Sequence, residues 1–115
     1  MLEKFPGENA LFDIDCSDLL AATETITGTP TLAFLPALTG GDALVFGVPT
    51  VNAAAVTYPD GSVAAIGKAI QVRISGGTST SASVPRAYAI TATFTTTAGN
   101  TLVAKASLQV MAVGP

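Results

Sequence analysis

The sequence contains no histidine and no tryptophan, and its single cysteine is Cys16. Without histidine the chain cannot form a Ser–His–Asp or Cys–His catalytic arrangement, and a zinc site of cysteine and histidine ligands is excluded. A lone cysteine cannot form an intrachain disulfide, so the chain is not a disulfide-stapled extracellular domain. We therefore expect a protein that is not an enzyme and binds no cofactor, with Cys16 packed as a small core residue.

Charged residues are scarce as well, at 11% of the sequence, against roughly a quarter in ordinary soluble domains. A surface this poor in charge favours a protein whose faces are partly covered by neighbours in an assembly. The net charge is −3 and the five basic residues are scattered, so we expect no binding to nucleic acid. No apolar run is long enough to span a membrane, and the first residues lack the basic and apolar regions of a signal peptide.

The acidic residues are concentrated at the start of the chain. Residues 1–24 hold six acidic side chains against one lysine. This acidic front could dock on a neighbouring copy, or it could be a solvated edge that prevents aggregation. Asp13, Asp15 and Asp18 could also bring carboxylates together for a calcium ion and support a calcium-assisted hydrolase, but the glycine and bidentate glutamate of an EF-hand loop are missing. We expect no metal site.

Strict alternation of apolar and polar residues dominates the rest of the sequence. The longest example is residues 84–113, which predicts a hairpin with Tyr88, Ile90, Ala92 and Phe94 on one face and a turn at residues 97–100. Shorter alternating or apolar runs, separated by glycine- and proline-containing turns, predict further strands over residues 10–16, 24–27, 31–35, 44–46, 53–58, 63–66 and 69–75.

Short strands at this spacing are typical of a β-sandwich. The predicted fold class is therefore all-β, a two-sheet immunoglobulin-like sandwich of about seven to nine strands. We place this single domain at residues 10–115. Residues 1–9, broken by Pro6-Gly7, are expected to form an irregular N-terminal arm.

Two parts of the sequence resemble known proteins. Residues 86–100, RAYAITATFTTTAGN, resemble the last two strands of immunoglobulin-like bacterial and phage domains. The front end, with FPGE, FDIDCSDLL and ETIT between residues 5 and 27, is similar to small immunoglobulin-like virion proteins of tailed bacteriophages. The two segments cover about a third of the chain, and residues 35–63 depart from the pattern. The resemblance implies a structural protein of the phage particle, of the head decoration, cement, head–tail or fibre type.

The leading hypothesis from the sequence is a non-enzymatic virion protein, made in the host cytoplasm, that binds the capsid surface or the head–tail region. Its expected partners are the major capsid protein or other virion proteins, with a homo-oligomer also open. The alternative is an immunoglobulin-like binding module of a bacterial surface adhesin or of a phage tail or fibre protein. The apolar Phe5 in a charged segment suggests that the arm docks on a neighbour. The predicted interface residues are Leu2, Glu3, Lys4, Phe5 and Pro6.

Overall fold

The structure is a computed structural model that describes residues 2–5, 8–35, 40, 43–77 and 86–111. These residues form ten strands and one 3₁₀ helix, η1 (Ser17–Leu19). The strands in chain order are β1 (Leu2–Lys4), β2 (Ala10–Asp15), β3 (Ile26–Leu35), β4 (Leu44–Phe46), β5 (Thr50–Val51), β6 (Val56–Thr57), β7 (Val63–Ala64), β8 (Ala69–Gly76), β9 (Arg86–Thr96) and β10 (Thr101–Val110).

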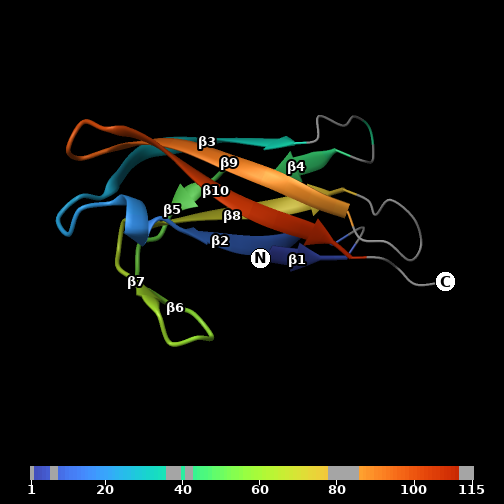
Figure 1. Ribbon diagram of the computed structural model, residues 1–115, viewed down its shortest axis with the longest axis horizontal. Helices are drawn as coiled ribbons and strands as arrows, with labels where there is room; N and C mark the ends of the chain where they lie inside the picture. The colour runs from blue at the N-terminus through green and yellow to red at the C-terminus, as the bar shows by residue number, and fades with distance from the viewer. Residues whose placement is uncertain (1, 6–7, 36–39, 41–42, 78–85, 112–115) are drawn as a thin grey trace.

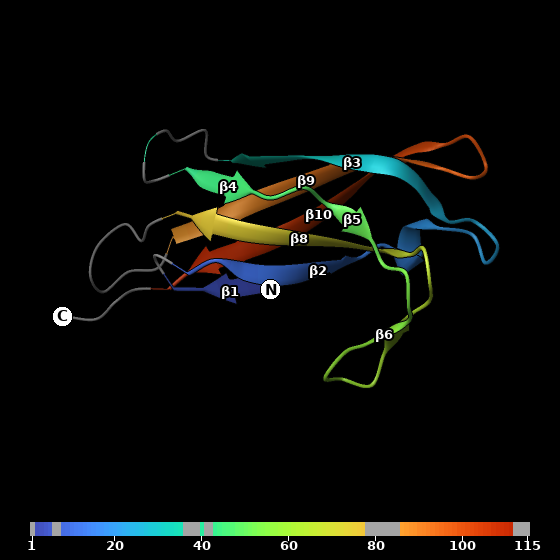
Figure 2. The ribbon, with the colours of Figure 1, turned by 180° about the vertical axis from the view of Figure 1, so that it is seen from behind.

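Two sheets lie face to face, with a small hairpin beside them (Figure 1). The first sheet has the order β1-β10-β9-β3, and the second has the order β2-β8-β4 with β5 also pairing to β8. Seen from behind, β4 and β5 follow one another along the same side of β8 (Figure 2). Among the strands that the structure describes, β6 and β7 pair with each other and with no other strand.

The strand order is that of an immunoglobulin-like sandwich. In that fold the second, fifth and fourth strands of the domain form one sheet and the third, sixth and seventh form the other. Here β2, β8 and β4 occupy the first set of places, and β3, β9 and β10 occupy the second. The predicted all-β, two-sheet fold is confirmed.

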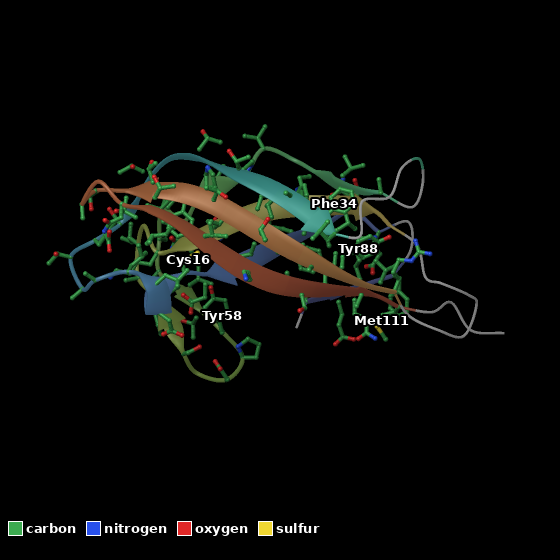
Figure 3. All side chains as sticks on the ribbon, turned by 45° about the horizontal axis from the view of Figure 1, so that its top comes forward. Cys16, Phe34, Tyr58, Tyr88 and Met111 are labelled. Atoms are coloured by element: carbon green, nitrogen blue, oxygen red, sulfur yellow. The ribbon has the colours of Figure 1, made fainter. Side chains whose placement is uncertain are left out.

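The core lies between the sheets and follows the predicted alternation. The apolar face predicted for β9 is buried throughout, and so are the alternating residues Ile70, Val72 and Ile74 of β8. Phe34 of β3 makes edge-to-face contacts with Tyr88 and with Phe46 of the second sheet, at ring-centroid distances of 6.1 and 6.0 Å (Figure 3 labels Phe34 and Tyr88). Aromatic pairs of this geometry add to the burial term, so Phe34 helps to join the two sheets.

Strand β3 differs from the prediction of two short strands around a turn. It is one strand of ten residues, whose register with β9 breaks between Thr27 and Thr31. Gly28 has a φ of 69°, so the residues expected to form a turn form a bulge. Because β3 is a sheet edge, the bulge and Pro30, which has no N–H to donate, leave the ladder with β9 otherwise intact.

The N-terminal segment is not an irregular arm throughout, and this expectation was wrong for residues 2–4. They form β1, which pairs in parallel with β10 at Leu108–Val110. The Lys4 carbonyl also accepts a hydrogen bond from the Met111 N–H, at 2.7 Å. Three residues are too few to show a period in the sequence, which is why alternation could not find this strand.

Lys4 fixes β1 to both sheets. The residue is 2% exposed, and its Nζ donates hydrogen bonds to the carbonyls of Phe5 and Gly76, both at 2.8 Å. Gly76 ends β8 of the second sheet. Burial lowers the pKa of Lys4, and the charge of Glu8 partly offsets the effect. The ammonium group therefore ties the edge of the first sheet to the end of a central strand in the second.

Asn52 holds the base of the β6–β7 hairpin. It is 2% exposed, and its Nδ2 donates to the carbonyls of Ala54 and Ala65, both at 2.9 Å. Its Oδ1 accepts from the backbone N–H groups of Lys68 at 3.1 Å and Ala69 at 2.9 Å. One amide thus connects the chain entering the hairpin with the chain leaving it, and so fixes where the hairpin lies.

We predict that Lys4→Ala lowers the free energy of unfolding by about 2 kcal/mol, because two carbonyls lose a charged donor and the buried stem is removed. Lys4→Met restores the stem but not the hydrogen bonds, and should recover part of the loss. Urea unfolding followed by circular dichroism measures both. The control is Lys105→Ala, since Lys105 is exposed on β10. Equal stability of the Lys4→Ala and Lys105→Ala variants would contradict this account of β1.

Candidate functional site

A groove opens where β1 ends. Strand β1 covers β10 only at Leu108–Val110, so the same edge of β10 has no strand partner in the described structure from Thr101 to Ser107. The edge strand β2 of the second sheet lies opposite. Between these edges is a depression of about 350 Å³ lined by Leu2, Asp13, Ile14, Asp15, Lys105, Ala106 and Ser107.

A larger depression adjoins the first and shares Leu2, Asp13 and Asp15 with it. Its volume is about 670 Å³, and its lining residues are Leu2, Glu3, Phe12, Asp13, Asp15, Tyr58, Pro59, Asp60 and Ser62. We call the two depressions together the acidic groove. Its walls come from β1, β2, the edge of β10 and the turn of the β6–β7 hairpin, so distant parts of the sequence meet there.

The hairpin that forms the outer wall projects from the body of the sandwich (Figures 1 and 2). Its turn, Tyr58-Pro59-Asp60-Gly61-Ser62, lies where a glycine- and proline-containing turn was predicted between the strands at 53–58 and 63–66. The Gly61 N–H donates to the Tyr58 carbonyl at 2.9 Å, and Gly61 has a φ of 88°, which favours glycine. Asp60 Oδ1 accepts hydrogen bonds from the Oγ and N–H of Ser62, and these lower the pKa of Asp60.

Tyr58 and Asp13 bring buried polar atoms into the groove. The Tyr58 hydroxyl and Asp13 Oδ1 are both buried, and neither has a hydrogen-bond partner in the described structure. Figure 3 shows Tyr58 between the hairpin and the body of the sandwich. Burial raises the pKa of Tyr58 to about 12, with smaller contributions from the charges of Asp15 and Asp13. The phenol is therefore neutral at physiological pH and lies beside carboxylates.

Asp15 and Asp18 do not join Asp13 as metal ligands. Asp15 Oδ1 accepts hydrogen bonds from the N–H of Ser17 at 2.9 Å and from its Oγ at 2.6 Å. Asp18 lies in the first turn of η1. Over the ranges that the structure describes, no group of three or more acidic or cysteine side chains is arranged to hold a metal ion. The calcium alternative thus gains no support from the geometry.

Cys16 packs in the core, as predicted. It is 1% exposed, and its Sγ lies 3.6 Å from the Ile14 carbonyl. Burial raises its pKa to about 11, and the charge of Asp15 adds to the effect. Because the thiolate is the nucleophilic form of cysteine, the Cys16 thiol is unreactive at neutral pH.

The five predicted interface residues have different environments in the structure. Leu2 and Glu3 line the acidic groove, and Phe5 is 55% exposed. Lys4 is buried and already bonded within the fold, so it is not available to a partner. Pro6 lies outside the described residues. Sequence reasoning missed Tyr58 and Asp60 as groove residues, although their turn was predicted, because nothing local indicates that the hairpin packs near β2.

Comparison with known proteins identifies the family. A family model described as podophage GP4 fiber-tail adaptor protein gp77 matches residues 4–109. The chain belongs to this family. The match begins in β1 and ends in β10, so it spans both sheets. No curated protein and no solved structure matches the chain.

Membership in this family makes the protein a structural component of the phage virion, at the tail and fibre. The general expectation of a virion structural protein is confirmed, and the description of the family as an adaptor agrees with the expectation of a non-enzyme. The family gives no support for the capsid surface as the binding site. Within the described residues, the structure has no helix that is long and apolar enough to cross a membrane.

We predict that Tyr58 ionises near pH 12 and that Asp13→Asn lowers this pKa only part of the way toward 10, because burial is the larger cause and remains. Titration of ¹³Cζ-labelled tyrosine followed by NMR measures the shift, with the Tyr58 signal assigned by Tyr58→Phe. The control is Glu8→Gln, which removes an acidic residue that does not line the groove. An ordinary pKa for Tyr58 in the parent protein would show that the hydroxyl is solvated.

Proposed function

We propose that this protein is a non-catalytic adaptor that joins a fibre to the tail of a podophage particle, and that the acidic groove contacts one of these two partners. The observation that carries the proposal is the family match over residues 4–109. The match covers both sheets and the hairpin, so the adaptor role is proposed for the whole sandwich.

An adaptor needs two separate surfaces, and two groups of exposed apolar side chains support such an arrangement. One group lies on the outer face of the second sheet, where Leu11 pairs with Arg73 across β2 and β8 and Val45 pairs with Ser75. Leu11 is 53% exposed and Val45 is 57% exposed. Arg73, which is also exposed, belongs to a residue type that is enriched among the residues contributing most to protein–protein binding.

The second group lies on and beside the hairpin. Val63 of β7 is 55% exposed, and Ile66, which follows β7, is 60% exposed. The hairpin also forms the outer wall of the acidic groove. Val63 and Ile66 belong to or adjoin the hairpin, which projects from the body of the sandwich (Figures 1 and 2), so they form a group separate from Leu11 and Val45.

Decoration of the capsid surface stays a prediction from the sequence that the family does not favour. The adhesin module also stays an alternative without support from the family. The three roles place the protein at different locations: on the capsid, on a bacterial surface, or where the fibre meets the tail. Locating the protein therefore distinguishes them.

We expect antibodies against this protein, detected with gold by electron microscopy, to label intact particles at the point where the fibres meet the tail. Preincubation of the antibodies with the purified protein should abolish the label and serves as the control. Gold spread over the capsid surface would instead support the decoration role and contradict the adaptor role.

A further inference from the structure

We propose that the acidic groove binds an arginine side chain presented by a partner virion polypeptide. The proposal rests on the adaptor function, because it names the chemistry by which one partner is recognised. It concerns the residues of β1, β2 and the hairpin turn that line the groove, and it assigns no role to the outer face of the second sheet.

The acidic groove carries an excess of negative charge. Four carboxylates line the groove, those of Glu3, Asp13, Asp15 and Asp60. The only basic lining residue is Lys105, at the edge of the smaller depression, and no ion pair joins it to these carboxylates in the described structure. A concave site with several carboxylates and little compensation attracts a cation.

Two residues that line the groove each bury a polar atom without a hydrogen-bond partner in the described structure. Asp13 Oδ1 and the Tyr58 hydroxyl are each buried and unbonded in the described structure. Leaving such atoms unpaired is costly, and each one in a native protein calls for an explanation such as a bound water, ion or ligand. Both oxygens can accept a hydrogen bond, so a ligand whose N–H donors reach them as the lining side chains adjust would supply the partners that they lack.

The arrangement of the acceptors in the groove favours arginine over other cations. A calcium ion needs a group of oxygen ligands, and the described residues do not provide one. Arginine carries five N–H donors in a planar fork, which suits acceptors spread over two strands and a turn. Serine hydrogen bonds engage Oδ1 of Asp15 and of Asp60, which leaves their Oδ2 atoms for a ligand.

The apolar lining fits the rest of the arginine side chain. Leu2, Phe12 and Pro59 line the same groove as the carboxylates. The aliphatic stem of arginine can cover such a surface while its charged end reaches the acceptors, and a guanidinium also stacks on an aromatic ring such as that of Tyr58.

The test uses the full-length protein and a defined probe. The peptide acetyl-Gly-Arg-Gly-amide is titrated into ¹⁵N-labelled protein at low salt, followed by NMR, with acetyl-Gly-Gln-Gly-amide as the neutral control. We expect saturable shifts confined to the groove residues with the arginine peptide and none with the glutamine peptide. A third peptide, acetyl-Gly-Lys-Gly-amide, should give weaker shifts, because its ammonium group lacks the planar fork of donors. The dissociation constant should rise with ionic strength, as expected for an exposed ionic contact.

Two substitutions locate the binding site. Asp13→Asn and Tyr58→Phe should each weaken binding of the arginine peptide by about tenfold, since the first removes the charge of one acceptor and the second removes the other acceptor. Each variant is first checked for an intact spectrum, and either one suffices if the other does not fold. Glu8→Gln, the control, should bind as the parent does.

The proposal is overturned if the arginine and glutamine peptides give the same shifts, or if a folded Asp13→Asn or Tyr58→Phe variant binds the arginine peptide as the parent does. Its failure is distinct from failure of the adaptor function. If the gold label lies at the fibre attachment point but the protein does not bind the arginine peptide, only the groove proposal is overturned. If the label lies on the capsid, the adaptor role is overturned, whatever the groove binds.

Discussion

The parallel pairing of β1 with β10 is the contact on which the rest of the site depends. It holds only three residues at the edge of the first sheet, and the chain then crosses to the second sheet, where β2 pairs with β8. Lys4 secures the crossing by donating to the carbonyl at the end of β8. Because β1 is so short, most of the β10 edge has no strand partner among the described residues, and the groove occupies the space between this edge and β2.

The groove differs from the base of the β6–β7 hairpin, where the buried polar side chain has all its hydrogen-bond partners. Asn52 shows what this fold does with a buried polar group that serves structure, because both its amide nitrogen and its amide oxygen are hydrogen-bonded. Asp13 and Tyr58 contrast with it, since each buries an oxygen without a partner in the described residues. Proteins tend to break local rules of this kind at functional sites, and the contrast is the physical reason for placing recognition in the groove.

The sequence predicted the features that depend on period and on turn chemistry. The β9–β10 hairpin, the inward face of β8 and the turn at Gly61 follow from alternation and from residues that accept a positive φ. Strand β1 could not be predicted, because three residues show no period and its partner is more than one hundred residues away. The bulge at Gly28 was read as a turn because local sequence does not show that the ladder with β9 resumes at Thr31.

The groove was only partly predictable for a related reason. Leu2 and Glu3 were expected at an interface, and the acidic front end pointed to Asp13 and Asp15. The contribution of Tyr58 depends on where the hairpin lies, which Asn52 fixes through contacts with residues up to 17 positions away. Long-range packing of this kind leaves no local signal in a single sequence.

The central claim is that the acidic groove is a docking site for a partner within the phage particle. A cryo-electron microscopy reconstruction of the tail with its fibres tests this claim most directly, because it shows what covers each face of the sandwich. The account predicts a segment of a neighbouring protein in the groove, with an arginine side chain within hydrogen-bond distance of Asp13 and Tyr58. A reconstruction in which the groove faces solvent while other surfaces are covered would contradict it.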